Sequence, residues 1–559
     1  MQQFLHFNLE TAHIKDAFLI TKPLALPFKK HLSIWQVCFI IALIWFCVFV
    51  VFRQAPEWDN MEELVWANSF EWGYQKHPPL PSWIIYPLTL LFGKAMWLPI
   101  ALGLTCVGLA QVISYYLYCR IAKNAGHSNP SSLGMLAVLT TSPLIYYSIR
   151  GGDFNHNAAQ LWSIAAMFYF YYRTWEFERE IDKKILNYWL SWLSLGVFTG
   201  LAFISKYSVV IQAAVLIIHF LISGRWRFHK AWTGILLAGC AFLFITTPHL
   251  YWLYGQTIIG QGPIYYVSHA MSTSASFFQR VWQVGYEFLF TQMIRVLPCL
   301  LIIGLTYQLC KTRSIDRKSG PSTRSWWLTI LNADQVFLWV LAIGPTVLAM
   351  LIGILFDQKI EAKWAVTFFI MVGFISWIFA NDQLSLPALT QQTITLHVVI
   401  GLGFGLVTGP LANYFGYQGR ANFPSKALAS VIQQRWQEHP ELTNGEPIQL
   451  IVGDTWIIGN IIIHDPITRG RNIKPWIDGE DLSSPWLKTE DQQKTALILI
   501  DGEPQPKGVW WRAGHPPTSR VQAMFDQANV KGVESIPWTS KEGAPPLKIQ
   551  WAILPYPLP

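Results

Sequence analysis

Three carboxylates with helical spacing are the first residues of this chain that could do chemistry. Asp59, Glu62 and Glu63 stand at positions i, i+3 and i+4, so a helix would gather them on one face, with Trp66 one turn further on. Crowded carboxylates repel one another and lose solvation, which raises some of their pKa values and suits one of them to act as a general base. The same spacing also fits a capping box with Asp59 at the N-cap and Glu62 at N3.

Cations and an imidazole follow in the same stretch of sequence. Lys76 and His77 stand beside the stiff dipeptide Pro78-Pro79. A lysine held near three carboxylates can bind the anionic part of a substrate, and a histidine can move a proton or bind a metal ion. This segment therefore combines a candidate base with candidate anion-binding groups.

A second polar cluster runs from Arg150 to Asn157 and contains Asp153, Asn155 and His156. Polar side chains at the start of an apolar helix are costly at membrane depth unless they face a cavity, so we expect Arg150, Asp153 and Asn155 to bind substrate. The alternative is that Asp153 is an ordinary cap of the following helix.

Two further residues are isolated candidates. Lys206 lies in a short turn between apolar segments, where a lysine can reach the interface and serve topology alone. His269 lies in the aromatic loop 251–283, and a lone histidine there is more often a surface residue than a ligand. No nucleotide-binding, Gly-x-Ser-x-Gly or His-Glu-x-x-His pattern occurs in a matching context.

The elements that must position these residues are membrane helices. Hydrophobic residues make up 52% of the 559 residues and charged residues only 13%. This composition excludes a soluble enzyme, a disordered protein and a secreted disulfide scaffold. The net charge of +8 lies between the apolar segments and not on a basic face, so we expect no nucleic-acid partner.

A spanning helix needs about 20 mostly apolar residues. The sequence predicts a polytopic α-helical protein with about 11 spans, whereas the short apolar stretch 81–93 is expected to lie along the interface. The expected spans are 33–53, 96–119, 131–149, 157–174, 188–204, 207–223, 231–250, 288–310, 335–356, 364–380 and 394–414.

Lysines and arginines concentrate in one set of alternate loops. The positive-inside rule then places the segment 1–32 in the cytoplasm, the first loop 54–95 outside and, after an odd number of spans, the tail 415–559 outside as well. The expected organisation is a membrane domain over 33–414 and an extramembrane α/β domain over 415–559. In the tail, 424–439 has helical periodicity, and 448–452, 496–500 and 549–554 are typical of strands.

With these residues in view, the chain resembles the GT-C glycosyltransferases. The likeness is to the bacterial family-39-like group that includes the lipid A aminoarabinose transferase and the protein O-mannosyltransferases. It rests on Asp59, Glu62, Trp72-Gly73-Tyr74 and the block 76–80, with weaker matches at 154–157, 200–207 and 247–252. It covers about residues 33–380 in the right order, and the tail has no confident match.

The resemblance implies transfer of a hexose or pentose from a polyprenyl-phosphate donor to an envelope acceptor, at the outer face of the bacterial inner membrane. The acceptor would be a lipid, a saccharide such as lipopolysaccharide, or a protein. Asp59 would occupy the position of the catalytic aspartate. Because Asn60 stands where many relatives have Glu, the second carboxylate is assigned to Glu62.

The resemblance also bears on the remaining site residues. His77 falls where the aminoarabinose transferases carry an acidic metal ligand, and His269 lies in the loop where they carry a histidine, so a divalent metal ion at these two residues stays open. Lys206 matches a family lysine near the lipid phosphate. Lys76, His77, Arg150, Asp153, Asn155 and Lys206 are thus the expected groups around the substrate.

A sugar phosphate already has a good leaving group, so this chemistry needs positive charge on the departing phosphate and a base facing the acceptor. Lys76, Lys206, Arg150 or a metal ion would meet the first need, and Asp59 the second. One base and direct displacement predict inversion at the anomeric carbon. The alternatives are a transporter or flippase of lipid-linked sugars and a non-catalytic lipid-sugar-binding relative. Ionisable residues clustered in one outer loop favour the enzyme.

Overall fold

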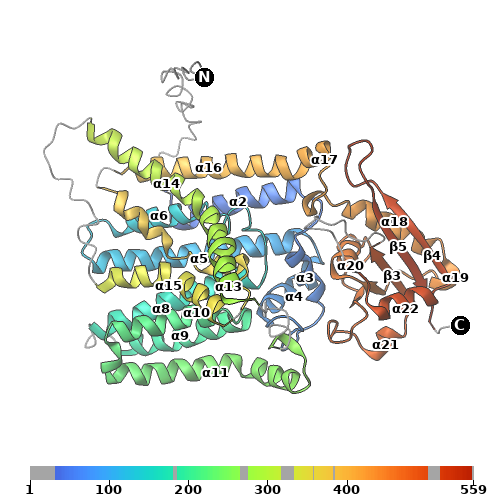
Figure 1. Ribbon diagram of the computed structural model, residues 1–559, viewed down its shortest axis with the longest axis horizontal. Coiled ribbons are helices and arrows are strands. Elements are labelled where there is room, and N and C mark those ends of the chain that lie inside the picture. Colours follow the sequence, from blue (N-terminus) through green and yellow to red (C-terminus); the bar gives the residue numbers. More distant parts are fainter. Residues whose placement is uncertain are drawn as a thin grey trace, which may run out of the picture.

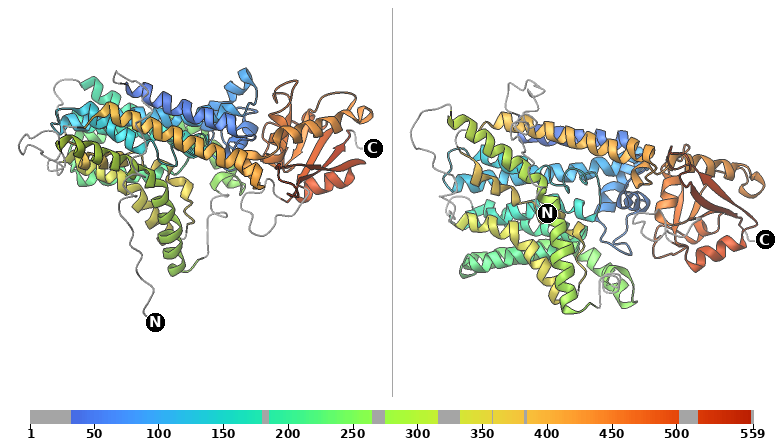
Figure 2. Two further views of the ribbon diagram at one scale, coloured as in Figure 1. Left: turned by 90° about the horizontal axis from the view of Figure 1, so that it is seen from above. Right: turned by 45° about the horizontal axis from the view of Figure 1, so that its top comes forward.

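The computed structural model describes residues 32–179, 185–264, 275–315, 333–356, 358–381, 384–501 and 516–556. Long helices run side by side in a bundle, and a compact α/β unit sits at one end of it (Figure 1). Two further views give the same arrangement, with α16 (Leu386–Leu406) lying along α2 (Ile34–Phe52) (Figure 2). The polytopic helical fold with a small C-terminal sheet unit is therefore confirmed.

Within the described ranges, seven helices are long and apolar enough to cross a membrane. The expected number of about 11 spans stays a prediction. The seven are Ile34–Phe52, Trp97–Asn124, Ile185–Ser205, His229–Ile258, Phe277–Cys310, Asp334–Leu355 and Leu386–Phe415. Five of them are single helices: α2, α5 (Trp97–Asn124), α9 (Ile185–Ser205), α11 (His229–Ile258) and α15 (Ala333–Leu355). The other two are each made of three consecutive elements. One is α13 (Phe277–Trp282), the π-helix η3 (Gln283–Leu289) and α14 (Phe290–Ile315), and the other is α16, η7 (Val407–Leu411) and α17 (Ala412–Phe415).

Other apolar segments form helices whose bounds differ from those expected. The helix predicted over 131–149 is α6 (Pro130–Thr141) followed by turns, and 157–174 falls on α7 (His156–Ala159) and α8 (Leu161–Arg179). The helix of 207–223 is α10 (Val209–Ile222), and 81–93 forms the short helix α4 (Leu80–Phe92).

The segment 364–380 differs most from expectation. Instead of one spanning helix it forms two 3₁₀ helices, η5 (Ala362–Thr367) and η6 (Val372–Phe379). Here η6 packs so closely on α6 that a Cβ atom at Gly373 would lie 2.1 Å from the carbonyl oxygen of Ala137. The segment is apolar because neighbouring helices bury it, and hydropathy alone cannot distinguish burial in protein from burial in lipid.

The tail contains a five-stranded mixed sheet in the order β2-β1-β3-β5-β4. Here β1 (Leu450–Gly453) pairs in parallel with β2 (Lys474–Ile477) and β3 (Ala496–Asp501), and β5 (Leu547–Leu554) pairs antiparallel with β3 and β4 (Val530–Ile536). The three predicted strands and the predicted helix, α18 (Ser425–Gln437), are all present, whereas the short β2 and the half-exposed β4 were not foreseen. The remaining short elements are η2 (Arg225–Arg227), η8 (Arg420–Asn422), α19 (Pro440–Thr443), α20 (Thr455–Ile462), α21 (Thr489–Gln492) and α22 (Ser519–Gln527).

The tail packs directly on the helix that carries the three carboxylates, α3 (Trp58–Trp66). Trp58 stacks on Trp456 of α20, with ring centroids 5.9 Å apart and planes inclined by 3°. The Arg420 guanidinium lies 5.6 Å and 5.7 Å from the centroids of these two rings. Met61 is fully buried in a core shared with the tail. The α/β unit thus forms one wall of the socket that holds α3.

Gly459 is the closest approach of α20 to α3, since a Cβ atom there would lie 2.3 Å from Met61 Sδ and 3.2 Å from Val65 Cγ2. We expect Gly459→Leu to lower the free energy of unfolding by about 1–3 kcal/mol, because the added side chain has no space. Thermal unfolding of the detergent-solubilised protein measures this. Gly304→Leu is the matched control, because no atom lies within 4 Å of a Cβ there. Equal unfolding midpoints for the two variants would contradict tight packing of α20 on α3.

Candidate active site

The three carboxylates of α3 do lie together, but Asp59 is not a cap. The N-cap residue is Glu57, which makes no side-chain cap bond, and Asp59 belongs to the first turn. Glu57 instead pairs with Arg53 and lies 3.6 Å from Arg420 Nη1. The capping-box interpretation of Asp59 is therefore wrong, because its carboxylate faces a cavity and accepts a hydrogen bond of 2.9 Å from Asn155 Nδ2.

That cavity is about 300 Å³ in volume, and we call it the catalytic cavity because it contains the candidate base. Its walls come from α3, the 76–78 segment, the start of α7, the turn between α9 and α10, and the loop that begins at 358. The lining residues are Asp59, Glu62, Glu63, Lys76, His77, Pro78, Asn155, His156, Asn157, Lys206, Tyr207, Ser208, Ile211, Ile352, Gln358, Ile360, Glu361, Lys363 and Trp364. Residues from five distant parts of the sequence thus face one space.

Three lysines face Asp59 across this cavity. Lys76 Nζ lies 3.1 Å from Glu62 Oε1, and Lys363 Nζ lies 3.4 Å from Glu361 Oε2. Lys206 donates a hydrogen bond of 2.7 Å to Asn157 Oδ1 and lies 5.2 Å from the Trp364 ring centroid. A purely topological role for Lys206 is therefore wrong, because its ammonium group points into the cavity and not to the interface.

The electrostatics of Lys206 follow from its surroundings. Burial and the nearby charge of Lys363 lower the pKa of Lys206 to about 7, although Asp59 and Glu361 act in the opposite direction. A lysine that is only partly charged at neutral pH gains charge when a phosphate enters, because the anion favours the ammonium form.

Glu63 is the carboxyl group that crowding changes most. Burial, together with the neighbouring Glu62 and Asp59, raises the pKa of Glu63 well above its usual range. Its oxygens lie 2.8 Å from Ser82 Oγ and 3.2 Å from His156 Nδ1. Because His156 Nε2 lies 3.2 Å from the Pro78 carbonyl oxygen and donates there, His156 Nδ1 accepts the Glu63 proton. A raised pKa was expected of the general base. The residue that has it is Glu63, and its proton is held in a hydrogen bond to His156.

His77 is packed against His156 with ring centroids 4.0 Å apart. Burial, His156 and the charges of Lys206 and Lys76 lower the pKa of His77 well below its usual range, so the ring is neutral. Over the described ranges, no three His, Cys, Asp or Glu side chains are arranged to hold a metal ion. The surrounding lysines would also repel a divalent cation at His77. His269, the other expected metal ligand, lies outside the described residues.

Arg150 and Asp153 pair with each other beside the catalytic cavity, with Arg150 Nε 2.6 Å from Asp153 Oδ2. Neither residue lines the cavity. Burial raises the pKa of Asp153 to about 7 even though Arg150 opposes this. The cap of α7 is Asn155, whose Oδ1 accepts from the backbone N–H groups of 157 and 158, so the cap interpretation of Asp153 is wrong. Asn155 therefore has two tasks, capping α7 and holding Asp59.

Asn60 fastens α3 to the second cluster. Its Nδ2 donates to the Gly152 carbonyl oxygen at 3.0 Å, and its Oδ1 accepts from the Phe154 N–H at 2.6 Å. An acidic residue at this position could accept the second bond but not donate the first.

We expect Asn60→Asp to lower the free energy of unfolding by about 1–3 kcal/mol, since the buried Gly152 carbonyl would face a carboxylate. Chemical unfolding in detergent measures the change, with the exposed Asn472→Asp as control. Unchanged stability of Asn60→Asp would show that the two hydrogen bonds do not fasten α3.

Lys363 and Trp364 are the site residues that sequence analysis did not assign. They belong to the loop Lys359-Ile360-Glu361-Ala362-Lys363-Trp364. A run of alternating charges between two apolar segments was the available signal. It was insufficient because the loop is distant in sequence from the first outer loop.

One protein family and several known proteins resemble this chain. The sequence model of the dolichyl-phosphate-mannose-protein mannosyltransferase family matches residues 76–252. The lipopolysaccharide core galacturonosyltransferase RgtA of Rhizobium johnstonii is 23% identical over 75% of this chain and 77% of its own length. RgtB of the same organism is 27% identical over 72% and 76%.

The crystal structure of ArnT from Cupriavidus metallidurans bound to undecaprenyl phosphate has the same fold, with a TM-score of 0.52, 11% identity and coverage of 92% of this chain and 97% of that one. The apo structure of the same protein gives 0.53, 10% and the same coverage. The likeness in fold therefore includes the tail, for which no family match was expected from the sequence. Together with the matching family and the two relatives, it shows that this multi-pass membrane chain is a GT-C-fold glycosyltransferase related to ArnT and to the protein mannosyltransferases.

Proposed function

We propose that the protein transfers a sugar from a polyprenyl-phosphate donor to a saccharide of lipopolysaccharide, at the periplasmic face of the bacterial inner membrane. The observation that carries this proposal is one cavity that places the Asp59 carboxylate opposite the ammonium groups of Lys76, Lys206 and Lys363. The donor class is that of the lipid named with ArnT, and the acceptor class is that of RgtA and RgtB.

The lysines would hold the phosphate of the donor. In the reaction the bond between the anomeric carbon and the phosphate oxygen breaks, and its electron pair leaves with the polyprenyl phosphate. Lys206 and Lys363 stabilise this charge because they act inside a partly closed cavity with little water to screen it. Ile211 and Ile352 line the same cavity and suit the first isoprene units.

Asp59 would act on the acceptor. As the acceptor oxygen forms its bond to the anomeric carbon, its proton passes to the Asp59 carboxylate, and Asn155 holds that carboxylate in place. A single displacement of this kind inverts the configuration at the anomeric carbon. No step is assigned to a metal ion, because His77 is neutral, packed against His156 and surrounded by lysines.

Reconstitution tests this proposal against its rivals. The purified protein in liposomes receives a polyprenyl phosphate carrying a radiolabelled hexuronic acid, with rough lipopolysaccharide as acceptor. We expect label in the lipopolysaccharide and release of polyprenyl phosphate in equal amounts. Movement of the intact labelled lipid across the bilayer without release would indicate a flippase, and binding without either outcome would indicate a non-catalytic relative.

A further inference from the structure

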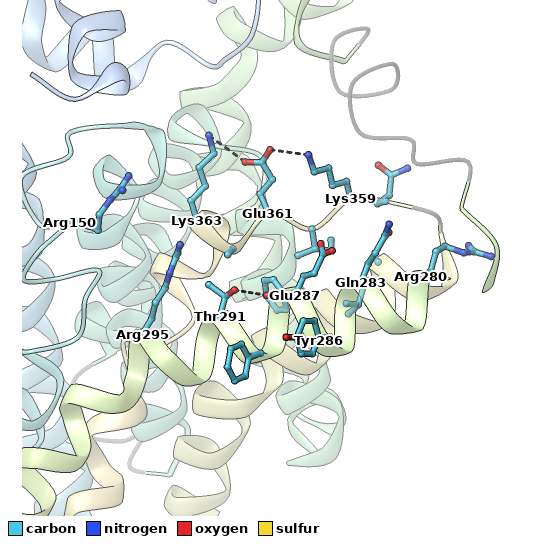
Figure 3. Close-up of a pocket in the computed structure, with 17 residues that line it drawn as sticks. Arg150, Arg280, Gln283, Tyr286, Glu287, Thr291, Arg295, Lys359, Glu361 and Lys363 are labelled. Carbon is cyan, nitrogen blue, oxygen red and sulfur yellow. Dashed lines mark hydrogen bonds and ion pairs between the residues drawn. The ribbon is translucent and has the colours of Figure 1, made fainter. Parts of the chain in front are cut away.

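A second cavity, about 720 Å³ in volume, adjoins the catalytic cavity. The α13–η3–α14 helix forms one side, and the loop around 358–363 forms the other (Figure 3). In this view Arg295, Glu287 and Gln283 project from the helix toward Lys363, Glu361 and Lys359 on the loop, and Arg150 closes one end. We call this space the arginine cavity.

Positive charge dominates the arginine cavity. Its lining contains the cations Arg150, Arg280, Arg295, Lys359 and Lys363, against the carboxylates Glu287 and Glu361. Glu361 is shared between both lysines, at 4.0 Å from Lys359 Nζ and 3.4 Å from Lys363 Nζ. One carboxylate between two ammonium groups leaves a net positive charge on this wall.

Two of the guanidinium groups are held in place before any ligand enters. Arg295 Nη1 donates to the Tyr146 hydroxyl at 2.7 Å, and its guanidinium carbon lies 4.7 Å from the Tyr146 ring centroid. Arg150 is held by Asp153. A guanidinium group with a fixed orientation can offer its remaining N–H groups to a carboxylate or phosphate in a bidentate contact.

The two cavities share the wall formed by Gln358, Ile360, Glu361 and Lys363. Asp59 acts electrostatically on residues of both cavities, because its negative charge raises the pKa of Arg150 and of Lys363. A molecule in the arginine cavity is therefore separated from the cavity that Asp59 and Lys206 line only by this shared wall.

We propose that the arginine cavity binds the anionic saccharide portion of the acceptor through its phosphate groups. This inference rests on the proposed transfer reaction and names the acceptor as an acidic sugar chain. The donor phosphate is already served by three lysines in the smaller cavity. In a direct displacement the nucleophile approaches the anomeric carbon opposite the leaving phosphate, so donor phosphate and acceptor need separate spaces on either side of that carbon.

Kinetics on the reconstituted protein test the assignment. We expect Arg295→Gln to raise KM for rough lipopolysaccharide by about 10-fold or more, because a charged hydrogen-bonded contact is lost, and to leave KM for the donor unchanged. Lys359→Gln is the second variant, since its side chain is 62% exposed and does not support the fold. Arg227→Gln, at a cation outside both cavities, is the control.

A binding measurement separates this inference from the proposed reaction. Isothermal titration uses the core oligosaccharide released from lipopolysaccharide by alkaline deacylation, before and after removal of its phosphates, with no donor present. We expect the phosphorylated form to bind more tightly and Arg295→Gln to remove the difference, even if no transfer is found. A rise of the donor KM instead, or equal binding of both oligosaccharides to the wild-type protein, would overturn the assignment.

Discussion

Asp59→Asn is expected to lower the turnover of sugar transfer by about 10²–10⁴-fold while the protein stays folded, because the variant loses the proton acceptor for the acceptor hydroxyl. The substitution is nearly isosteric, and Asn155 can keep its 2.9 Å contact with the oxygen of the new side chain. KM for the donor should change little, since Lys76, Lys206 and Lys363 remain. The measurement is label transfer in proteoliposomes under single-turnover conditions.

Two variants control for this effect. Glu62→Gln should reduce turnover less than Asp59→Asn, because Glu62 is already paired with Lys76 at 3.1 Å. The exposed Asp526→Asn on α22 should have no effect. Near-normal turnover in Asp59→Asn would remove this residue from the role of base, and a larger loss in Glu62→Gln would transfer that role to Glu62.

Lys206→Gln is expected to lower kcat/KM for the donor by about 10²–10³-fold, because one fixed positive charge at the departing phosphate is lost. The wild-type protein should also show a pH dependence from this residue. Its pKa is lowered to about 7, so the ammonium form is present below that pH and is lost as the pH rises through it. Since kcat/KM reports the free enzyme, it should fall on the alkaline side of about pH 7.

Lys206→Arg distinguishes charge from shape. A guanidinium stays protonated throughout this pH range, so the alkaline fall should disappear even if the maximum rate is lower. Lys230→Gln, at an exposed lysine at the start of α11, should leave the profile unchanged. An identical alkaline fall in the Lys206→Arg variant would assign the titration to another group.

The tail shows which structural features local sequence patterns can predict and which they cannot. Its three central strands and its first helix were predicted correctly because alternating and helical periodicities are local properties. Its role as a wall of the α3 socket depends on the stack of Trp58 on Trp456, which joins residues about 400 positions apart. A tryptophan at position 58 or 456 does not by itself indicate which residue it contacts.

The first outer loop shows the same division at the level of the site. The spacing of Asp59, Glu62 and Glu63 predicted a helix with one acidic face, and α3 has it. Which of the three changes its pKa was not predictable, because the outcome depends on Ser82 and His156, which bury and bond Glu63. Desolvation is a property of the three-dimensional surroundings and not of spacing.

By itself, the sequence determined that the protein is a polytopic membrane protein and that its family likeness is to the GT-C glycosyltransferases. That its chemistry belongs to the loop 54–95 stays a prediction. Composition and short-range periodicity suffice for these conclusions, because lipid demands long apolar helices and a helix fixes the face of its own residues. Only the tertiary structure decided that Lys363 lines the same cavity as Asp59, that Arg150 belongs to the neighbouring cavity, and that 364–380 is buried in protein. These outcomes depend on contacts between distant segments, and long-range packing leaves no periodic trace in a single sequence.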